Sequence, residues 1–190
     1  MDAPPDFFAV VNGQRACREF TDTPVGDEDL ALVLEAATRA PSAENRQPWH
    51  FVVVRDRQRR HAIGEVIGEV WRKGGQAWSR ERLAPDLFAD VDQGLRGGLI
   101  DAPVLIVVCG DTDVTDAGVL ASSIYPATQN LMLAAHALGL GSVLTTIATI
   151  DPAPVRELIA APAAIVPMAI VPIGHPARAL GRSRRQPIAN

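Results

Sequence analysis

The stretch from residue 116 to residue 138 places the tightest constraint on what this chain can fold into. It reads DAGVLASSIYPATQNLMLAAHAL, is rich in Ala and Leu, and is apolar almost all round at helical spacing. A helix of that kind must be buried, so the sequence predicts a central helix that ends at Gly139 and Gly141 by a C-cap and a tight turn. Because few polar residues are left for a surface of its own, the pattern also indicates burial by a second protomer.

Helices and short apolar strands alternate around this central helix. Amphipathic spacing predicts helices at residues 27–39, 57–72 and 152–159. Asp27 is the expected N-cap of the first helix, and Pro41 stops it. Short β-branched runs predict buried strands at residues 50–54, 103–109, 142–146 and 165–173. The alternation implies one sheet covered by helices on both faces, in the α+β to α/β range.

Residues 74–100 break this pattern. Glycine and proline interrupt the segment repeatedly, and its aromatic residues stand among charges. This composition predicts a mobile excursion with short helical pieces, a candidate lid. Trp71 and Trp78 flank a glycine pair, where they are equally compatible with roofing a substrate and with ordinary packing.

Length and charge exclude several classes of protein. The 190 residues suit one compact domain, and 18 Lys and Arg against 22 Asp and Glu give a formal charge of −4. That balance argues against general binding of nucleic acid or of an anionic membrane surface. Every apolar run is shorter than the ~18 residues that span a bilayer, and the N-terminus does not have the pattern of a secretory signal. We therefore expect a cytoplasmic protein.

Reactive side chains are few and scattered. Lys73 is the single lysine, so anion binding has to rely on arginine and its planar fork of donors. Two cysteines, Cys17 and Cys109, are too few for a zinc knuckle or a disulfide framework. None of the four histidines needs a catalytic role. The sequence predicts neither a metal site nor a side-chain nucleophile.

Two groups of arginines could bind an anion. Arg15 and Arg18 are three residues apart, so on a helix they would share one face and could converge on a phosphate. The plainer interpretation of this pair is two solvated surface arginines. Arg182, Arg184 and Arg185 form a cationic tail that either is disordered or returns to the core and closes over an anion.

A third group of polar residues lies in residues 40–51, APSAENRQPWHF. Ser42, Asn45 and Gln47 are uncharged donors and acceptors on a loop between a helix and a buried strand. Such side chains can bind the polar edge of a planar heterocycle. Alternatively, they cap backbone groups in a Pro-rich turn.

Taken together and in this order, these groups resemble the nitroreductase family of flavin enzymes over nearly the whole chain. Residues 15–20 (RACREF) look like the family's Arg-Arg-Ser-x-Arg-x-Phe opening. Residues 40–51 match its Ala-Pro-Ser-x-x-Asn-x-Gln-Pro-Trp-x-Phe block at every fixed position. Residues 130–142 are similar to its central helix and the strand after it, and residues 173–176 with Arg185 to its final strand and arginine tail.

The resemblance implies an α+β fold, a three-layer α/β/α sandwich with a mostly antiparallel central sheet, in an intertwined homodimer with a flavin at the subunit interface. It implies a single domain over residues 1–190, with residues 74–100 as candidate lid and residues 174–190 as C-terminal tail. The implied cofactor is FMN, with NAD(P)H as reductant. The implied partner is a small-molecule electron acceptor, with no nucleic acid and no membrane.

The resemblance also implies which residues bind the cofactor. The family holds the FMN phosphate with arginines of the opening motif and of the tail, which here are Arg15, Arg18 and Arg185, with Arg184 beside them. Of these, Arg18 is the best candidate for the N1–O2 edge of the ring, where it would stabilise the anionic reduced form and leave the phosphate to Arg15 and the tail. The other implied contacts lie in the opening motif, the loop block and the segment after the central helix: Ala16, Cys17, Pro41, Ser42, Asn45, Gln47, Leu144, Thr145 and Thr146.

Two departures from the family pattern concern the ends of the flavin site. Gln14 stands where many members have a first arginine, and Ala16 stands where they have serine. Both changes leave more of the phosphate binding to the arginines of the C-terminal tail. Residues 145–147 contain no acidic residue, although some members place a glutamate there near the reactive ring nitrogen.

The implied activity is a ping-pong exchange. A reduced nicotinamide passes hydride to the flavin and leaves, and a nitroaromatic, a quinone or a related acceptor takes its place. Two alternatives stay open. One is a flavin enzyme of different chemistry on the same scaffold, such as dehydrogenation, dehalogenation or flavin fragmentation. The other is a flavin- or deazaflavin-binding dimer that sequesters the cofactor.

Overall fold

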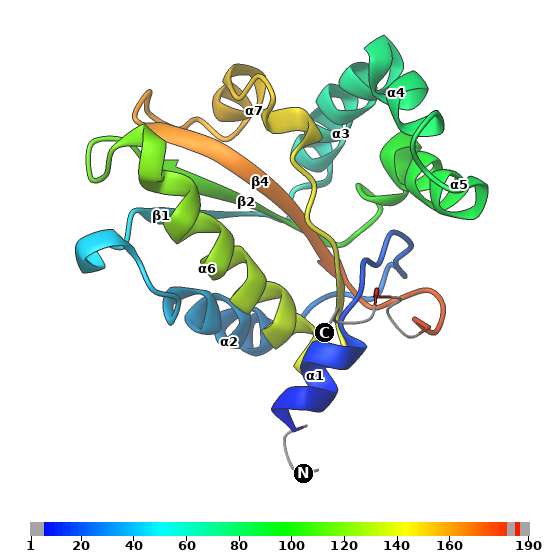
Figure 1. The fold of residues 1–190 in the computed structure, drawn as a ribbon, viewed down its shortest axis with the longest axis horizontal. Coiled ribbons are helices and arrows are strands. Elements are labelled where there is room, and N and C mark those ends of the chain that lie inside the picture. The colour runs from blue at the N-terminus through cyan, green and yellow to red at the C-terminus, as the bar shows by residue number, and fades with distance from the viewer. Residues whose placement is uncertain (1–5, 182–184, 187–190) are drawn as a thin grey trace.

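A four-stranded antiparallel sheet forms the centre of the computed structural model, which describes residues 6–181 together with Arg185 and Gln186 (Figure 1). The strands are β1 (Trp49–Val54), β2 (Val104–Asp111), β3 (Gly141–Ser142) and β4 (Ile165–Gly174). Their order across the sheet is β1-β2-β4-β3. The long strands β2 and β4 therefore occupy the middle, where both faces of each strand are covered.

Seven α-helices are present in the described chain: α1 (Phe7–Gly13), α2 (Asp27–Thr38), α3 (Arg57–Val70), α4 (Gln76–Arg80), α5 (Pro85–Gln93), α6 (Ala117–Ala137) and α7 (Ala153–Leu158). Short 3-10 and π turns complete the helical elements: η1 (Ala43–Asn45), η2 (Trp71–Gly75), η3 (Gly94–Gly98) and η4 (Ile147–Thr149). In the described residues no helix is both long and apolar enough to cross a membrane.

Strand β2 contributes side chains to two hydrophobic cores, one on each face of the sheet. Val104 and Ile106 enter the core that contains α2 and α6, whereas Leu105 and Val107 enter the core that contains α3 and α7. Successive side chains of a strand face opposite sides, so a continuous apolar run requires cover on both. This arrangement confirms the expected three-layer α/β/α sandwich and its antiparallel sheet.

Helix α6 is the central helix that the sequence predicts. Leu120, Ile124, Leu131 and Ala135 are buried in the core shared with α2 and the sheet. Tyr125, on the other side of α6, is exposed. One chain thus buries only one side of a helix that is apolar almost all round.

Two local predictions are wrong. The strand expected at residues 142–146 ends at Ser142, and Thr145 forms only an isolated bridge with Ile170. The backbone leaves the extended conformation at Thr146 (φ −113°, ψ 2°), where η4 is about to begin. The expected N-cap Asp27 is instead the first residue of α2, because Gly26 adopts the extended capping conformation before it.

The excursion at residues 74–100 contains the expected short helical pieces, α4, α5 and η3. Asp92 attaches α5 to η2 and to α4, since its carboxylate accepts hydrogen bonds from Nε1 of Trp71 at 2.8 Å and from Nε2 of Gln76 at 2.9 Å. Arg96 pairs with the same carboxylate at 2.9 Å. Burial raises the pKa of Asp92, but these hydrogen bonds outweigh it and hold the pKa below its usual value. Trp71 thus serves in packing.

Gly139 ends α6 in the way the sequence predicts, and this provides a stability test. Its φ is +77°, and the N–H of Leu140 donates to the carbonyl of Ala135 at 2.8 Å, as in a Schellman motif. We expect Gly139→Ala to lower the free energy of unfolding by about 1–2 kcal/mol, because alanine resists the left-handed region. Urea denaturation monitored by circular dichroism measures the change.

Gly118→Ala is the matched control. Gly118 lies in the first turn of the same helix, and at both glycines a Cβ would meet no atom within 4 Å. Ordinary helix propensity predicts an unchanged free energy of unfolding or a gain of up to about 1 kcal/mol at Gly118. Equal losses at both positions would contradict the conformational explanation.

Candidate functional site

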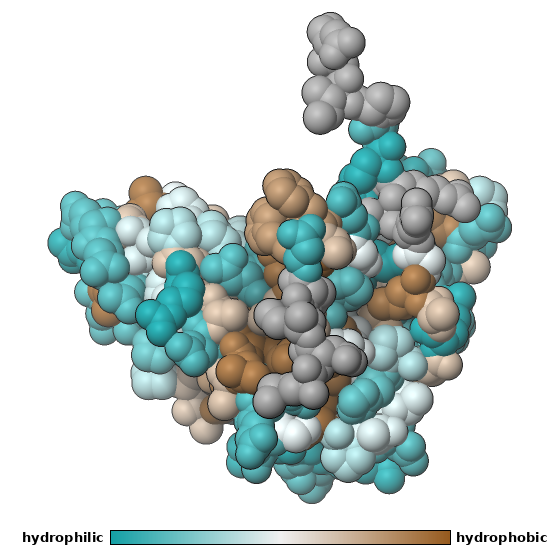
Figure 2. Space-filling view, turned by 90° about the horizontal axis from the view of Figure 1, so that it is seen from below, coloured by the Kyte–Doolittle hydropathy of each residue, from teal (hydrophilic) through white to brown (hydrophobic). Residues whose placement is uncertain are grey.

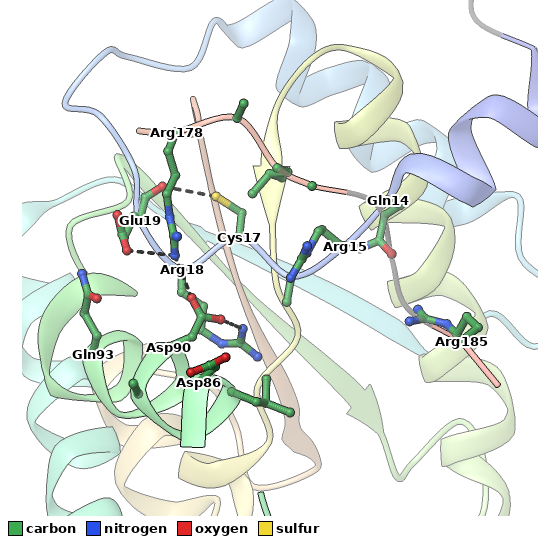
Figure 3. Close-up of a pocket in the computed structure, with 16 residues that line it drawn as sticks. Gln14, Arg15, Cys17, Arg18, Glu19, Asp86, Asp90, Gln93, Arg178 and Arg185 are labelled. Atoms are coloured by element: carbon green, nitrogen blue, oxygen red, sulfur yellow. Dashed lines mark hydrogen bonds and ion pairs between the residues drawn. The ribbon is translucent and has the colours of Figure 1, made fainter. Parts of the chain in front are cut away.

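A cavity of about 780 Å³ brings together three segments that are far apart in the sequence (Figure 3). Residues 14–19 form one wall, side chains of α5 form another, and the segment after β4 closes the third side with residues 178–181 and Arg185. The volume lies within the ~300–1,000 Å³ that ligand pockets usually have. This cavity is the candidate site.

The opening segment reaches the cavity as extended backbone along the edge of the sheet. Helix α1 ends at Gly13, and Ala16 then forms a parallel bridge with Ser142 of β3. The N–H of Cys17 donates to the carbonyl of Ser142 at 3.0 Å. The helical geometry considered for Arg15 and Arg18 is therefore wrong, because pairing with β3 extends this part of the chain. Both arginines nevertheless line the cavity.

The C-terminal segment returns to the opening segment, as the arginine-tail hypothesis requires. The N–H of Ala177 donates to the carbonyl of Glu19 at 3.1 Å. Farther along, a Cβ at Gly181 would lie 3.2 Å from Nη1 of Arg15, so the tail passes directly against that guanidinium. Arg15 and Arg185 line the same cavity. Two further arginines of the predicted tail cluster, Arg182 and Arg184, lie outside the described residues.

Arg18, Glu19, Asp90 and Arg178 form a chain of ion pairs at one end of the cavity, here called the Asp90 network. Oδ2 of Asp90 accepts a hydrogen bond from Nη1 of Arg18 at 2.5 Å. Its other oxygen, Oδ1, accepts one from Nη2 of Arg178 at 2.9 Å. Arg178 also pairs with Oε1 of Glu19 at 3.1 Å. Figure 3 shows these side chains together on one side of Arg15. Sequence reasoning missed Asp90 and Arg178, since no local pattern links a lid helix to residues so distant.

The loop block does not reach this cavity within one chain. The N–H of Ala43 in η1 donates to Oγ of Ser123 at 3.1 Å, in the first half of α6. Gly13, beside the opening segment, lies against His136 at the far end of that helix. Thirteen residues of helix separate these contacts by about 20 Å. Accordingly, the cyan loop and α1 lie at opposite ends of α6 in Figure 1.

The loop block has an unusual backbone. Glu44, Asn45 and Gln47 adopt φ values of 53°, 55° and 52°, in the left-handed region that non-glycine residues seldom occupy. Ser42 Oγ accepts from the N–H of Gln47 at 3.0 Å, so the capping interpretation holds for this serine. Left-handed non-glycine residues cost of order 1 kcal/mol each and cluster at functional sites. Contact of this loop, from Pro41 onward, with a flavin stays a prediction.

Leu144, Thr145 and Thr146 follow β3, next to the strand edge that the opening segment occupies. Thr145 exchanges two backbone hydrogen bonds with Ile170, at 3.0 Å and 2.9 Å. Leu144 packs against the first core, and Thr146 is exposed. Among the described residues that line the cavity, none comes from this segment.

The thiols are not suited to nucleophilic chemistry. Cys17 lines the cavity but is only 1% exposed, and burial raises the pKa of its thiol. Burial raises the pKa of Cys109 to about 12. Both thiols are therefore protonated at neutral pH, which leaves them poor nucleophiles. The described residues also contain no group of three or more His, Cys, Asp or Glu side chains that could hold a metal ion.

The donors at the cavity suit an anionic ligand of nucleotide size. Arg15 and Arg185 supply guanidinium groups, which bind phosphate oxygens with two parallel hydrogen bonds. Gly181 lies so close to Arg15 that a side chain there would crowd the guanidinium. The residues present thus fit the phosphate of an anionic cofactor.

Comparisons with known proteins agree on one family. The profile described as "Nitroreductase family" matches residues 11–175. A Methanothermobacter thermautotrophicus protein provisionally named NADH dehydrogenase/NAD(P)H nitroreductase is 31% identical over 90% of this chain and 78% of its own. The NAD(P)H-linked FMN reductase of Bacillus subtilis is 29% identical over 91% and 67%. A structure of iodotyrosine deiodinase bound to FMN and 3-iodo-L-tyrosine has a TM-score of 0.77 at 25% identity and covers 96% of each chain.

Alkylation of the two thiols tests how well the fold buries them. Because burial raises the pKa of both, the folded protein should not react with iodoacetamide at pH 8, whereas both cysteines should react after unfolding in guanidinium chloride. Mass spectrometry of the alkylated protein measures this. Rapid labelling of Cys17 in the folded protein would show that its thiol is open to the cavity.

Proposed function

The chain belongs to the nitroreductase family, and from this premise we propose that it uses NAD(P)H to reduce nitroaromatics, quinones or related acceptors through FMN held in the arginine-lined cavity. Family membership makes the protein a flavin oxidoreductase, with FMN as cofactor and NAD(P)H as reductant. When bound, FMN supplies the hydride chemistry. The protein's own residues then have to bind FMN, orient its ring and shield it from water.

The observation that carries this proposal is the meeting of the opening segment and the tail at one cavity. Arg15 and Arg185 lie in segments 170 residues apart, yet line the same space. In the proposed site they bind the phosphate, together with Arg184. Gln14 also lines the cavity and has an amide where many family members have an arginine. The tail arginines therefore account for more of the phosphate binding than in those members.

Arg18 has the position for the other end of the cofactor. Its side chain is 17% exposed and is fixed by Asp90, so its charge is less screened than that of a surface arginine. A fixed cation that meets the N1–O2 edge of the ring favours the form with more negative charge, the reduced form. This is the role we assign to Arg18.

We propose a homodimer, because within one chain the loop block lies away from the cavity. Phe7 and Phe8 of α1 are 65% and 68% exposed, and Tyr125 is exposed on α6. Figure 2 views the molecule from below, the side on which α1 lies in Figure 1, and shows apolar surface gathered near the middle of that face. Burial of such surface stabilises association. Within its own chain, the loop with Ser42, Asn45 and Gln47 lies far from the cavity. In the proposed dimer this loop instead completes the cavity of the partner subunit.

Anaerobic titration tests the proposed activity. The purified protein should be yellow, lose its flavin absorbance when NADH or NADPH is added, and regain it with p-nitrobenzamide or a quinone. If 3-iodotyrosine restores the flavin absorbance instead, the protein catalyses dehalogenation on the same scaffold. A flavin that stays oxidised with both nucleotides would indicate a protein that holds the cofactor.

The phosphate assignment predicts how variants bind two related flavins. We expect Arg15→Gln and Arg185→Gln each to weaken FMN binding by about 10- to 100-fold, the range for a lost hydrogen bond to a charged group. Riboflavin lacks the phosphate, so its affinity should change by no more than about threefold, within ordinary surface-mutation effects. Quenching of flavin fluorescence measures both dissociation constants.

Arg39→Gln serves as the control for lost positive charge. Arg39 lies at the end of α2 and pairs with Glu35 on the same helix, both largely exposed. Its replacement should leave the affinity for FMN and for riboflavin unchanged. Equal weakening of both flavins by Arg15→Gln would place that arginine at the ring instead of the phosphate.

A further inference from the structure

We infer that Asp90 is a positioning residue for Arg18, which it fixes at the end of the cavity and whose charge it partly offsets, so that α5 sets how strongly the site prefers reduced over oxidised FMN. The inference rests on the proposed function, because it takes Arg18 at the flavin edge as its starting point. A residue of the candidate lid thereby helps to set the redox potential of the bound cofactor.

The geometry places one carboxylate between two guanidinium groups. Asp90 uses Oδ2 for Arg18 and Oδ1 for Arg178, so neither arginine displaces the other. Arg178 is held in turn by Glu19, next to Arg18 in the chain. The opening segment, α5 and the tail are thus joined through a single side chain of α5.

Close packing restricts Arg18 further. A Cβ at Gly94 would lie 2.9 Å from Cδ of Arg18, and a Cβ at Gly98 would lie 2.5 Å from its carbonyl oxygen. The turn after α5 therefore has no space for side chains where it passes Arg18. Since Asp90 itself is 25% exposed, the ion pair is only partly screened by water. Its electrostatic effect should exceed that of a fully exposed pair.

The charges of the Asp90 network decide the direction of the effect. Arg18 and Arg178 balance Glu19 and Asp90, two positive groups against two negative. In Asp90→Asn the close packing of Gly94 and Gly98 and the remaining acceptor oxygen keep Arg18 in place. The variant therefore removes only the negative charge that offsets Arg18 and leaves one positive charge uncompensated beside it. The reduced ring carries more negative charge than the oxidised ring, so that excess favours the reduced form. The midpoint potential of bound FMN should therefore rise.

Asp90→Asn tests the inference most directly, because asparagine keeps the size of the side chain and one acceptor oxygen. We expect the ratio of affinities for reduced over oxidised FMN to rise about tenfold, which a two-electron couple reports as about 30 mV. Equilibration with a reference dye under anaerobic conditions measures the potential of the bound cofactor. Fluorescence quenching gives the affinity for oxidised FMN separately.

Three companion variants make the test specific. Arg18→Gln should lower the potential, and Asp90→Asn should raise it by less than half as much in the Arg18→Gln background as in the wild type, because most of its effect acts through Arg18. Arg178→Gln should also lower the potential. Its side chain is 61% exposed, so this variant keeps the test available if Asp90→Asn does not fold.

Asp86→Asn is the matched control. Asp86 lies on the same helix and lines the same cavity, and in the described part of the chain it forms an ion pair with neither Arg18 nor Arg178. Its replacement should shift the potential by less than half as much as Asp90→Asn. An equal shift would show a general charge effect and overturn the pairing with Arg18.

The failures of the two proposals are distinguishable. If Arg18→Gln lowers the potential but Asp90→Asn leaves it unchanged or lowers it, the inference about Asp90 is wrong and the proposed function stands. If the shift caused by Asp90→Asn keeps its full size without Arg18, the inference is wrong as well. If the wild-type protein does not bind FMN, the proposed function fails first.

Discussion

Backbone pairing of the opening segment with β3 and with the segment after β4, at the edge of the sheet, is the interaction on which the candidate site depends. The N–H of Cys17 bonds to Ser142 of β3, and the N–H of Ala177 bonds to Glu19. Main-chain hydrogen bonds do not require particular side chains. The departures at Gln14 and Ala16 can therefore change the donors offered to a ligand while the path of the chain stays the same. The position of the site and its affinity for a ligand thus depend on different features of the chain.

The sheet, the central helix and most of the layering could be predicted from sequence because burial leaves little choice. A continuous apolar strand such as β2 has to be covered on both faces, and α6 has to be central. The prediction failed where tertiary pairing decides the local conformation. Arg15 and Arg18 lie in extended chain because β3 pairs with it, and the strand expected to include Thr146 stops early for the turn into η4.

The site was predicted in part. Motifs of the family indicated both the opening arginines and Arg185, and the structure brings those that it describes to one cavity. Asp90 and Arg178 could not be found in the same way, because their importance arises from ion pairs across 72 and 88 residues of sequence. The loop block shows a third case. Its residues were identified by motif, but one chain holds them about 20 Å away along α6.

Two carboxylates of α5, two positions apart, attach this helix to different parts of the molecule. Asp92 accepts hydrogen bonds from Trp71 and Gln76, whereas Asp90 pairs with Arg18 and Arg178 at the cavity. The exposed turn at residues 81–84, between α4 and α5, has no such anchors among the described side chains beyond a contact of Arg82 with Trp78 and Glu81. Insertions and sequence drift should accumulate in that turn. Such changes would leave both anchors of α5, and with them the arginines of the cavity, in place.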